Sequence, residues 1–302
     1  MKVRLQTPWF RRGVLAVLVG IGLSACSPRQ LVVGSLADEL ASPALGNETD
    51  LILLRDAAPF HLKLSETVLH QQPGHRALAE AVAAGFTQYA YAFLAFDADR
   101  IEATDAGAAE RLRRRAAGLY ARAHRHAMTA LEISQPGLTA VLAGSTPGGT
   151  LHIEPAQVGL AYWAAASWGG WISLSKDEPD VVADLPQAIR LTEAAWRVDP
   201  TWGQGALSGL MGSFEAARPG GSPVLALRYF DQAIRDSGGT GAAALVAKAE
   251  GYALPGGDRP MFEVLLRQAL AIREAAGSPL AVQNEVMRQR AAWLLSKADD
   301  LF

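Results

Sequence analysis

The stretch AIRLTEAAWRVDP (residues 188–200) carries the pattern from which the architecture of this chain can be predicted. Ala188, Thr192 and Ala195 are spaced by four and then three positions, so they share one face of a helix. Small residues let a neighbouring helix approach, and the larger one between them fills the gap. Pro200 then ends the helix. The stretch therefore predicts a helix packed closely against its neighbours.

The same small–large–small spacing recurs along the chain, which is the pattern of the second helix of a tetratricopeptide repeat. From Ala188 to Ala226 is 38 residues, and from Ala226 to Phe262 is 36. From Ala116 to Ala188 is 72 residues, or two such periods. Alanine-rich helices also produce such triplets by chance, but the regular spacing favours degenerate repeats. The other three matches are Ala116/Tyr120/Ala123, Ala226/Phe230/Ala233 and Phe262/Leu266/Ala269, whose first member is large.

Composition and turn signals predict an all-α fold. Alanine, leucine and arginine dominate, and neither a hairpin signal nor an alternating valine-rich run is present. Proline and glycine mark loops between the expected helices. Together with the repeats, this predicts an alpha-solenoid of degenerate tetratricopeptide-like helix pairs. The expected loops lie at 73–74, 136–149, 179, 199–200, 218–223, 237–239 and 255–260.

The N-terminus is expected to be a lipoprotein export signal. A basic start is followed by the apolar run GVLAVLVGIGLS (residues 13–24), which is too short for a permanent membrane span. The run ends in LSAC (residues 23–26), which resembles a bacterial lipobox. The alternative is an uncleaved membrane anchor with a chance cysteine. We expect a signal at 1–25, lipidation of Cys26, a tether at 26–35 and a single helical-repeat domain at 36–302. Serine after the cysteine suggests the periplasmic face of the outer membrane.

Charge and cysteine content exclude several classes of function. The chain has 28 basic and 30 acidic side chains. Removing Lys2, Arg4, Arg11 and Arg12 with the signal leaves 24 against 30, a net charge of −6. A mildly acidic body argues against a nucleic-acid partner. Cys26 is the only cysteine, so no disulfide, thiolate metal site or cysteine nucleophile is expected.

Aromatic residues gather in AYWAAASWGGW (residues 161–171). At 100° per residue, Trp163, Trp168 and Trp171 fall within an arc of about 140°, and the small residues and Tyr162 occupy the other side. The small side is expected to permit tight helix packing. Tryptophan is preferred where an apolar body meets something polar or exchangeable. The residues alone leave a bulky core and a cavity lining equally open.

A second aromatic stripe lies in residues 86–96. Phe86, Tyr89, Phe93 and Phe96 share a helical face, while Tyr91 is expected to point away from it. If the solenoid interpretation holds, this helix pairs with the tryptophan-bearing one. The two stripes would then face each other.

A specific family resemblance extends over nearly all of the expected mature chain. The stretches that carry it are HLKLSETVLHQQP (61–73), GFTQYAYAFL (85–94), LYARA (119–123), LAYWAAASWGGWISLSKDEPDVVADLP (160–186) and DPTWGQGAL (199–207). In this order and at these intervals, they resemble the T component associated with tripartite ATP-independent periplasmic (TRAP) transporters.

The resemblance implies both a shape and partners. It implies helix pairs curled around a central cavity, a periplasmic substrate-binding protein as partner, and an apolar small molecule as a possible ligand. It also favours the cavity lining over the core. The predicted lining is Tyr89, Phe93, Trp163, Trp168 and Trp171. Contact with the membrane would be through the lipid anchor alone, and homo-oligomers are possible.

No catalytic or metal-binding constellation is predicted, and no cofactor is expected. Ser173 and Lys176 form an SxxK match, but the companion motifs of penicillin-binding proteins are missing. A cell-wall hydrolase would require these two side chains to face each other in a cleft. His124 and His126 lie on different faces of a helix, so joint metal ligation is not expected.

Lys63 and Glu66 are interpreted as a solvated ion pair. The chain as a whole is interpreted as a non-enzymatic accessory protein of solute uptake. The alternative is a general interaction scaffold of the cell envelope that binds no ligand.

Lipidation of Cys26 yields the first prediction. Two or three fatty chains anchor a protein stably, whereas one is marginal. Cys26→Ser should therefore give unprocessed or unanchored protein, which intact mass and membrane fractionation would detect. Maturation of this variant to the same mass and membrane fraction would contradict the lipobox interpretation.

Overall fold

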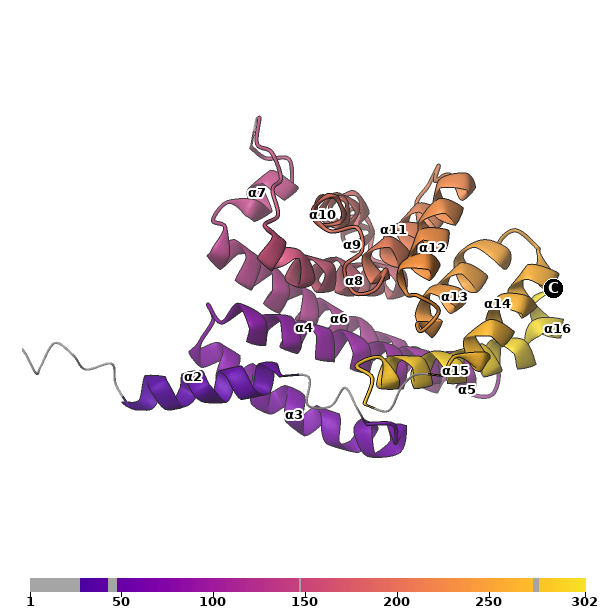
Figure 1. Ribbon diagram of the computed structural model, residues 1–302, viewed down its shortest axis with the longest axis horizontal. Helices are drawn as coiled ribbons and strands as arrows, with labels where there is room; N and C mark the ends of the chain where they lie inside the picture. The colour runs from indigo at the N-terminus through magenta and orange to yellow at the C-terminus, as the bar shows by residue number, and fades with distance from the viewer. Residues whose placement is uncertain (1–27, 43–47, 147, 274–276) are drawn as a thin grey trace, which may run out of the picture.

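The computed structural model describes residues 28–302 apart from 43–47, 147 and 274–276 (Figure 1). The described residues form helices and no strand, so the predicted all-α class is confirmed. The helices are, in order, α2 (Pro28–Ala41), α3 (Leu51–Gln71), α4 (Arg76–Ala90), the π-helical turn η1 (Tyr91–Ala95), α5 (Phe96–Ile101), α6 (Ala106–Ser134), α7 (Leu138–Leu142), the 3₁₀ turn η2 (Pro155–Gln157), α8 (Val158–Leu174), α9 (Pro179–Val182), α10 (Leu185–Val198), α11 (Ala206–Ala217), α12 (Pro223–Asp236), α13 (Ala242–Lys248), the π-helical turn η3 (Ala249–Ala253), α14 (Arg259–Ala271), α15 (Ala281–Ser296) and α16 (Ala298–Leu301).

The predicted export signal and Cys26 lie outside the described residues. Helix α2 begins at Pro28, within the segment 26–35 that was expected to be a tether, and it packs against α3 and α4. Ala37 of α2 is fully buried. In the described part of the chain, no helix combines the length and apolar character that crossing a membrane requires.

The repeat pattern correctly identifies a set of buried helix faces. The four triplets lie on α6, α10, α12 and α14, and none of their twelve side chains is more than 5% exposed. The ring of Phe230 shows why the pattern works. A Cβ atom on Gly212 of α11 would lie 2.8 Å from this ring, and one on Gly251 of η3 would lie 2.9 Å from it. The large residue therefore fills a space that glycines on both neighbouring helices leave open.

The segment 136–149 differs from the irregular loop that was expected. It contains the short helix α7, whose Leu138 and Leu142 are 1% exposed. The carboxylate of Glu132 accepts hydrogen bonds from the backbone N–H of Gly137 at 2.6 Å and of Thr139 at 2.9 Å. It thereby satisfies donors at the start of α7 that a helix leaves unpaired. Burial of the two leucines and this cap stabilise a helix that glycine and proline obscure in the sequence.

The chain returns on itself at its C-terminal end. Helices that follow one another from α10 to α15 pack pairwise in order, as expected for stacked helix pairs. Helix α15 then packs against α3, and Figure 1 shows it running beside α5. The first and last parts of the fold thus enclose a space between them. The order of contacts agrees with the solenoid interpretation, which stays a prediction for the arrangement as a whole.

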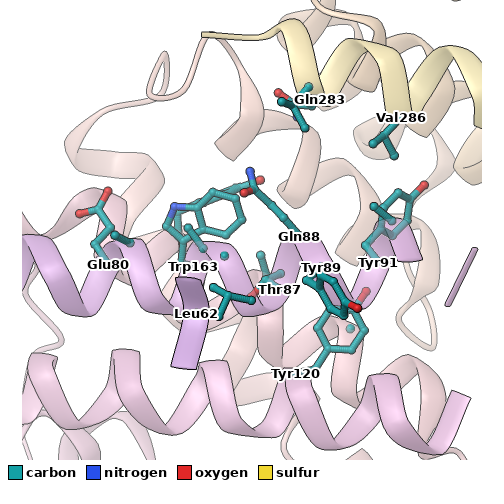
Figure 2. Close-up of a pocket in the computed structure, with 18 of the residues that line it drawn as sticks. Leu62, Glu80, Thr87, Gln88, Tyr89, Tyr91, Tyr120, Trp163, Gln283 and Val286 are labelled. Atoms are coloured by element: carbon teal, nitrogen blue, oxygen red, sulfur yellow. The ribbon is translucent and has the colours of Figure 1, made fainter. Parts of the chain in front are cut away.

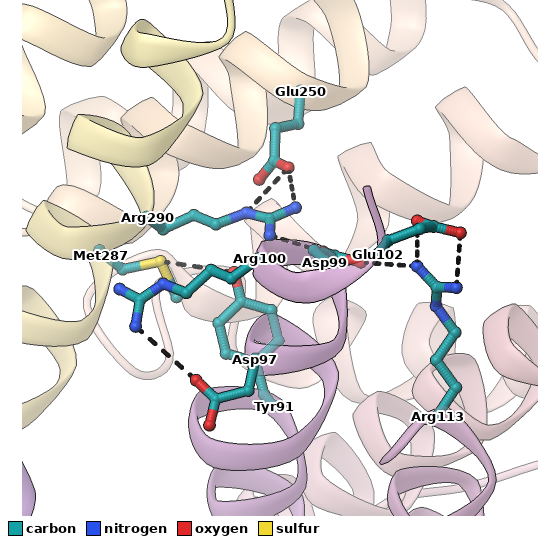
Figure 3. A network of polar contacts seen from close by, with 9 residues as sticks. All are labelled: Tyr91, Asp97, Asp99, Arg100, Glu102, Arg113, Glu250, Met287 and Arg290. Atoms are coloured by element: carbon teal, nitrogen blue, oxygen red, sulfur yellow. Dashed lines mark hydrogen bonds and ion pairs between the residues drawn. The ribbon is translucent and has the colours of Figure 1, made fainter. Parts of the chain in front are cut away.

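Arg290 of α15 is central to the polar contacts that join these two parts (Figure 3). Its guanidinium donates to Asp99 of α5 at 2.6 Å and to Glu250 of η3 at 2.6 Å, and only 13% of its side chain is exposed. Arg113 of α6 also contacts Asp99, at 3.3 Å. The guanidinium of Arg290 further lies 5.1 Å from the ring centroid of Phe96. One arginine therefore connects α5, η3 and α15.

Replacing Arg290 tests this connection. Arg290→Met keeps most of the apolar stem but leaves Glu250 without its cation. We expect the free energy of unfolding to fall by about 3 kcal/mol, as for a buried ion pair that loses one partner. Arg114→Met is the control, because Arg114 is 71% exposed and its pair with Glu110 is 3.7 Å long. The control should cost under about 1 kcal/mol. Equal losses in urea titrations of the two variants would contradict the proposed role of Arg290.

Candidate functional site

A cavity of about 880 Å³ lies in the space between the early helices and α15 (Figure 2). Its walls come mainly from α3, α4, η1, α8, α11 and α15. Small residues on two facing helices explain why it is open. Helix α4 presents Ala77, Ala81 and Ala84 to it, and α8 presents Ala166 and Gly169. Side chains of this size do not reach across the gap, so the helices enclose a volume instead of a packed core.

Three of the five aromatic residues predicted to line a cavity do line this one. They are Tyr89 of α4, Phe93 of η1 and Trp163 of α8. Tyr89 and Phe93 have ring centroids 5.2 Å apart, and Phe93 packs with Leu54 and Ala58 of α3. Both aromatic segments, residues 86–96 and 161–171, therefore contribute to the cavity wall.

Trp168 and Trp171 lie elsewhere, contrary to the expectation. Neither borders the cavity. Trp168 is 5% exposed and packs on the imidazole of His124 of α6, with centroids 4.3 Å apart. The centroid of Trp171 lies 6.3 Å from the same imidazole. These two tryptophans belong to the contact between α6 and α8.

The reason is that the cavity faces the opposite side of α8 from the one predicted. Tyr162, Ala166, Gly169 and Ser173 follow each other at steps of four and three and all line it. The small residues were expected to permit close helix packing. Some do, since a Cβ atom on Gly170 would lie 2.7 Å from the ring of Tyr120. Along most of this face, however, small side chains leave space for the cavity.

Tyr91 lies in the wall between this cavity and a second one. The second cavity has a volume of about 600 Å³, and Tyr91, Tyr162 and Met287 border both. The Tyr91 hydroxyl donates to the sulfur of Met287 at 4.0 Å. Burial, with the nearby charge of Glu250, raises the pKa of Tyr91 well above its usual range.

Tyr91 was expected to point away from the aromatic stripe; it packs against the cluster of Leu94 and Tyr120, whereas Phe93 packs with Leu54 and Ala58. Tyr91 begins the π-helical turn η1, in which the N–H of Phe96 bonds to the carbonyl of Tyr91. A π turn inserts an extra residue, so a wheel drawn at 100° per residue misplaces the residues that follow Tyr91 relative to those before it. Tyr89, Tyr91 and Phe93 all border the cavity.

The polar groups around the larger cavity are few. Glu80 lies on α4, and its carboxylate packs against α8 at Gly159, where a Cβ atom would lie 2.2 Å from Oε1. Burial raises the pKa of Glu80. Ser65 of α3 also lines the cavity, and its hydroxyl is buried without a hydrogen-bond partner among the described residues. Burial lowers the pKa of His61, which lines the same space.

Glu66 is a buried carboxylate, not half of a solvated ion pair. Its side chain is 2% exposed, accepts hydrogen bonds from Lys63 and from His126 Nε2 at 2.7 Å, and forms an ion pair with Arg122 Nε at 2.7 Å. Burial favours the neutral form, but the hydrogen bonds from Lys63 and His126 and the charge of Arg122 outweigh it and lower the pKa of Glu66 to about 2.

Possible ligand atoms of Glu66, His70 and His126 lie within 4.8 Å of one another, a spacing that would admit a metal ion. Two permanent cations, Lys63 and Arg122, already hold the carboxylate. They oppose the approach of a further positive charge. We interpret the cluster as a connection between α3 and α6.

The SxxK match is not arranged as a nucleophile and base. The hydroxyl of Ser173 donates to the carbonyl of Gly170 at 2.8 Å. Its proton is thus directed to the preceding helical turn. Lys176 is exposed beyond the end of α8.

The chain is all-α in its described residues, with packed helices around a largely apolar cavity, and a comparison with protein families assigns it to one of them. The family model described as TRAP transporter T-component matches residues 47–302, so the chain belongs to this family. The family is a transporter-accessory family and not an enzyme family. Membership implies a role beside a TRAP transporter, in the cell envelope or periplasm. An uncharacterized protein of Treponema pallidum (strain Nichols) is 26% identical over 304 residues, covering 92% of this chain and 94% of that protein.

His124 allows the placement of Trp168 to be tested through pH. Desolvation by burial lowers the pKa of His124 from 6.5 to about 4, despite a hydrogen bond to the carbonyl of Ala164. The unfolded chain therefore binds the proton more tightly. Stability is fully present above pH 6.5 and is lost as pH falls toward 4. The loss from this group between pH 7.5 and 5 should be about 2 kcal/mol.

His124→Phe should remove this part of the pH dependence while keeping a ring against Trp168. The measurement is the free energy of unfolding from urea titrations at pH 7.5 and 5. His61 and His126, whose pKa values burial also lowers, are present in both proteins, so the difference reports on His124. Identical pH dependences would mean that His124 and Trp168 do not form a desolvated contact.

Proposed function

We propose that this protein is a lipid-anchored periplasmic accessory component of a TRAP-type uptake system that holds an apolar or amphipathic small molecule in its larger cavity and binds the periplasmic substrate-binding protein. The cavity of about 880 Å³ is the observation that carries the proposal. Its volume falls in the range typical of small-molecule sites. A protein that served only as a rigid scaffold would gain stability by filling this space.

The lining favours an apolar occupant. Phe93, Val286 and Leu210 form parts of the wall, with Tyr89 and Trp163 among them. Burial of apolar surface contributes on the order of 25 cal/mol per Å², so a molecule with one alkyl chain gains several kcal/mol on entering. Part of this gain is offset by the loss of its translational and rotational freedom.

The partner part of the proposal rests on family membership. A chain of packed helix pairs presents an extended surface suited to a globular partner. Anchoring through Cys26 at the periplasmic face of the outer membrane would keep this surface beside the substrate-binding protein. The alternative remains an envelope scaffold that grips its partner but takes no ligand.

A variant with a filled cavity distinguishes a protein that binds a ligand from a scaffold that binds only a partner protein. In Ala84→Phe the new ring would enter open space, since Ala84 borders the cavity. We expect labelling of the protein by a photoreactive decanol in isolated envelopes to fall at least about tenfold. Ala57→Phe, at an exposed position of α3 away from the cavity, is the control and should label normally.

Chemical crosslinking in the same envelopes reports on the partner. Recovery of a crosslink to a periplasmic substrate-binding protein in wild type and Ala84→Phe would support both parts of the proposal. Crosslinking without any cavity labelling of the wild type would favour the ligand-free scaffold. Labelling of the cavity without a crosslink would contradict the proposed binding of a substrate-binding protein.

A further inference from the structure

The larger cavity holds one ionisable carboxylate that its surroundings leave without compensation. Among the described residues that line it, Glu80 is the only Asp, Glu, Lys or Arg. No hydrogen bond or ion pair joins Glu80 to another described residue. Arg76, one helical turn earlier on α4, acts on it only through its field and is itself exposed. A charge placed against an apolar wall is costly unless something pairs with it.

The second cavity provides the contrast within the same molecule. Among its described lining residues, Glu250 is the only Asp, Glu, Lys or Arg, and Arg290 pairs with it at 2.6 Å. The fold therefore neutralises one cavity-facing carboxylate with an arginine of its own. Glu80 has no such partner within the described chain.

Two effects act on the charge of Glu80 in opposite directions. Its carboxylate packs at Gly159, the second residue of α8, beside the positive end of that helix dipole. Burial acts in the opposite direction and raises the pKa of Glu80. A cation arriving in the cavity would favour ionisation and remove much of the cost of burial.

The surroundings of Glu80 suit a particular kind of cation. Trp163 lies one turn after Gly159 on α8, and Figure 2 shows its indole at the same end of the cavity as Glu80. Tyr89 and Tyr91 stand toward the other end in that view. An indole face beside a carboxylate is a favourable environment for an alkylammonium group, which gains from both. The apolar remainder of such a molecule would extend toward Tyr89 and Phe93.

We propose that the larger cavity selects an amphipathic cation, with its ammonium head at Glu80 and Trp163 and its apolar chain directed toward Tyr89 and Phe93. This inference rests on the proposed function, because it names the class of molecule that the cavity holds. It also excludes a class: the carboxylate of a fatty acid would face Glu80 with like charge and no compensating cation.

Three photoreactive probes with the same ten-carbon chain test the inference on the full protein in isolated envelopes. They carry a trimethylammonium, a carboxylate or a hydroxyl head and a diazirine at the far end of the chain. Competition by the unlabelled compound gives the half-maximal concentration for each. Membrane partitioning of a given probe is the same for every variant, so each probe is compared between wild type and variant only.

Glu80→Gln is the decisive variant, since it removes the charge and keeps the shape. We expect it to raise the half-maximal concentration of the ammonium compound by about tenfold, to leave that of the alcohol within about twofold and to lower that of the carboxylate. Glu178→Gln, an exposed acid away from the cavity, should match the wild type. Unchanged labelling by the alcohol also shows that the variant is folded.

The outcomes distinguish this inference from the proposed function. Equal competition by the ammonium compound in wild type and Glu80→Gln, with normal labelling by the alcohol, would overturn the proposed selection of an amphipathic cation. It would leave the proposed function standing. A wild type that prefers the carboxylate would do the same. Absence of labelling by all three probes would overturn the proposed function and this inference with it.

Discussion

The contact of Arg290 with Asp99 and Glu250 is the constraint on which the enclosed form of this protein depends. Stacked helix pairs that follow one another need no contact between the first and last of them. Here α15 packs against α3, and a nearly buried guanidinium connects α5 with η3. Because Asp99 also contacts Arg113 of α6, the network of ion pairs around Arg290 joins four helical elements, α5, α6, η3 and α15. Helix α15 thereby supplies part of the cavity wall, at Val282, Val286 and Met287.

Enclosure by itself would give a packed core if the facing side chains were large. Ala77, Ala81 and Ala84 on α4 and Ala166 on α8 line the cavity, and their side chains are too short to fill it. Large residues such as Phe214 meet glycines at the edges: a Cβ atom on Gly169 would lie 2.9 Å from its ring. Small residues thus have two effects in this fold. Where an aromatic ring opposes them they bring helices together, and where no large side chain opposes them they leave space.

These two effects mark the limit of what the sequence could predict. The helix class and the buried triplets follow from local spacing, which a single helix determines, and both were predicted correctly. Whether the small side of α8 meets a ring or an alanine depends on α4, α6 and α11, which are distant in the chain. Trp168 was therefore placed in the cavity although it packs on His124. Glu66 was placed in solvent for the same reason, since its partners Arg122 and His126 come from another helix.

The two π-helical turns, η1 and η3, show how closure and the cavity wall are joined. Each widens a helix by one residue, a change that disturbs regular hydrogen bonding and is frequent at functional sites. Tyr91, at the start of η1, contacts Met287 of α15, and Glu250, within η3, contacts Arg290 of the same helix. Met287 and Arg290 are three residues apart and lie on one face of α15. Both irregular turns thus direct a polar side chain at the helix that closes the fold. Tyr91 and Met287 both border the two cavities, so the wall between the cavities lies where η1 meets the helix that closes the fold.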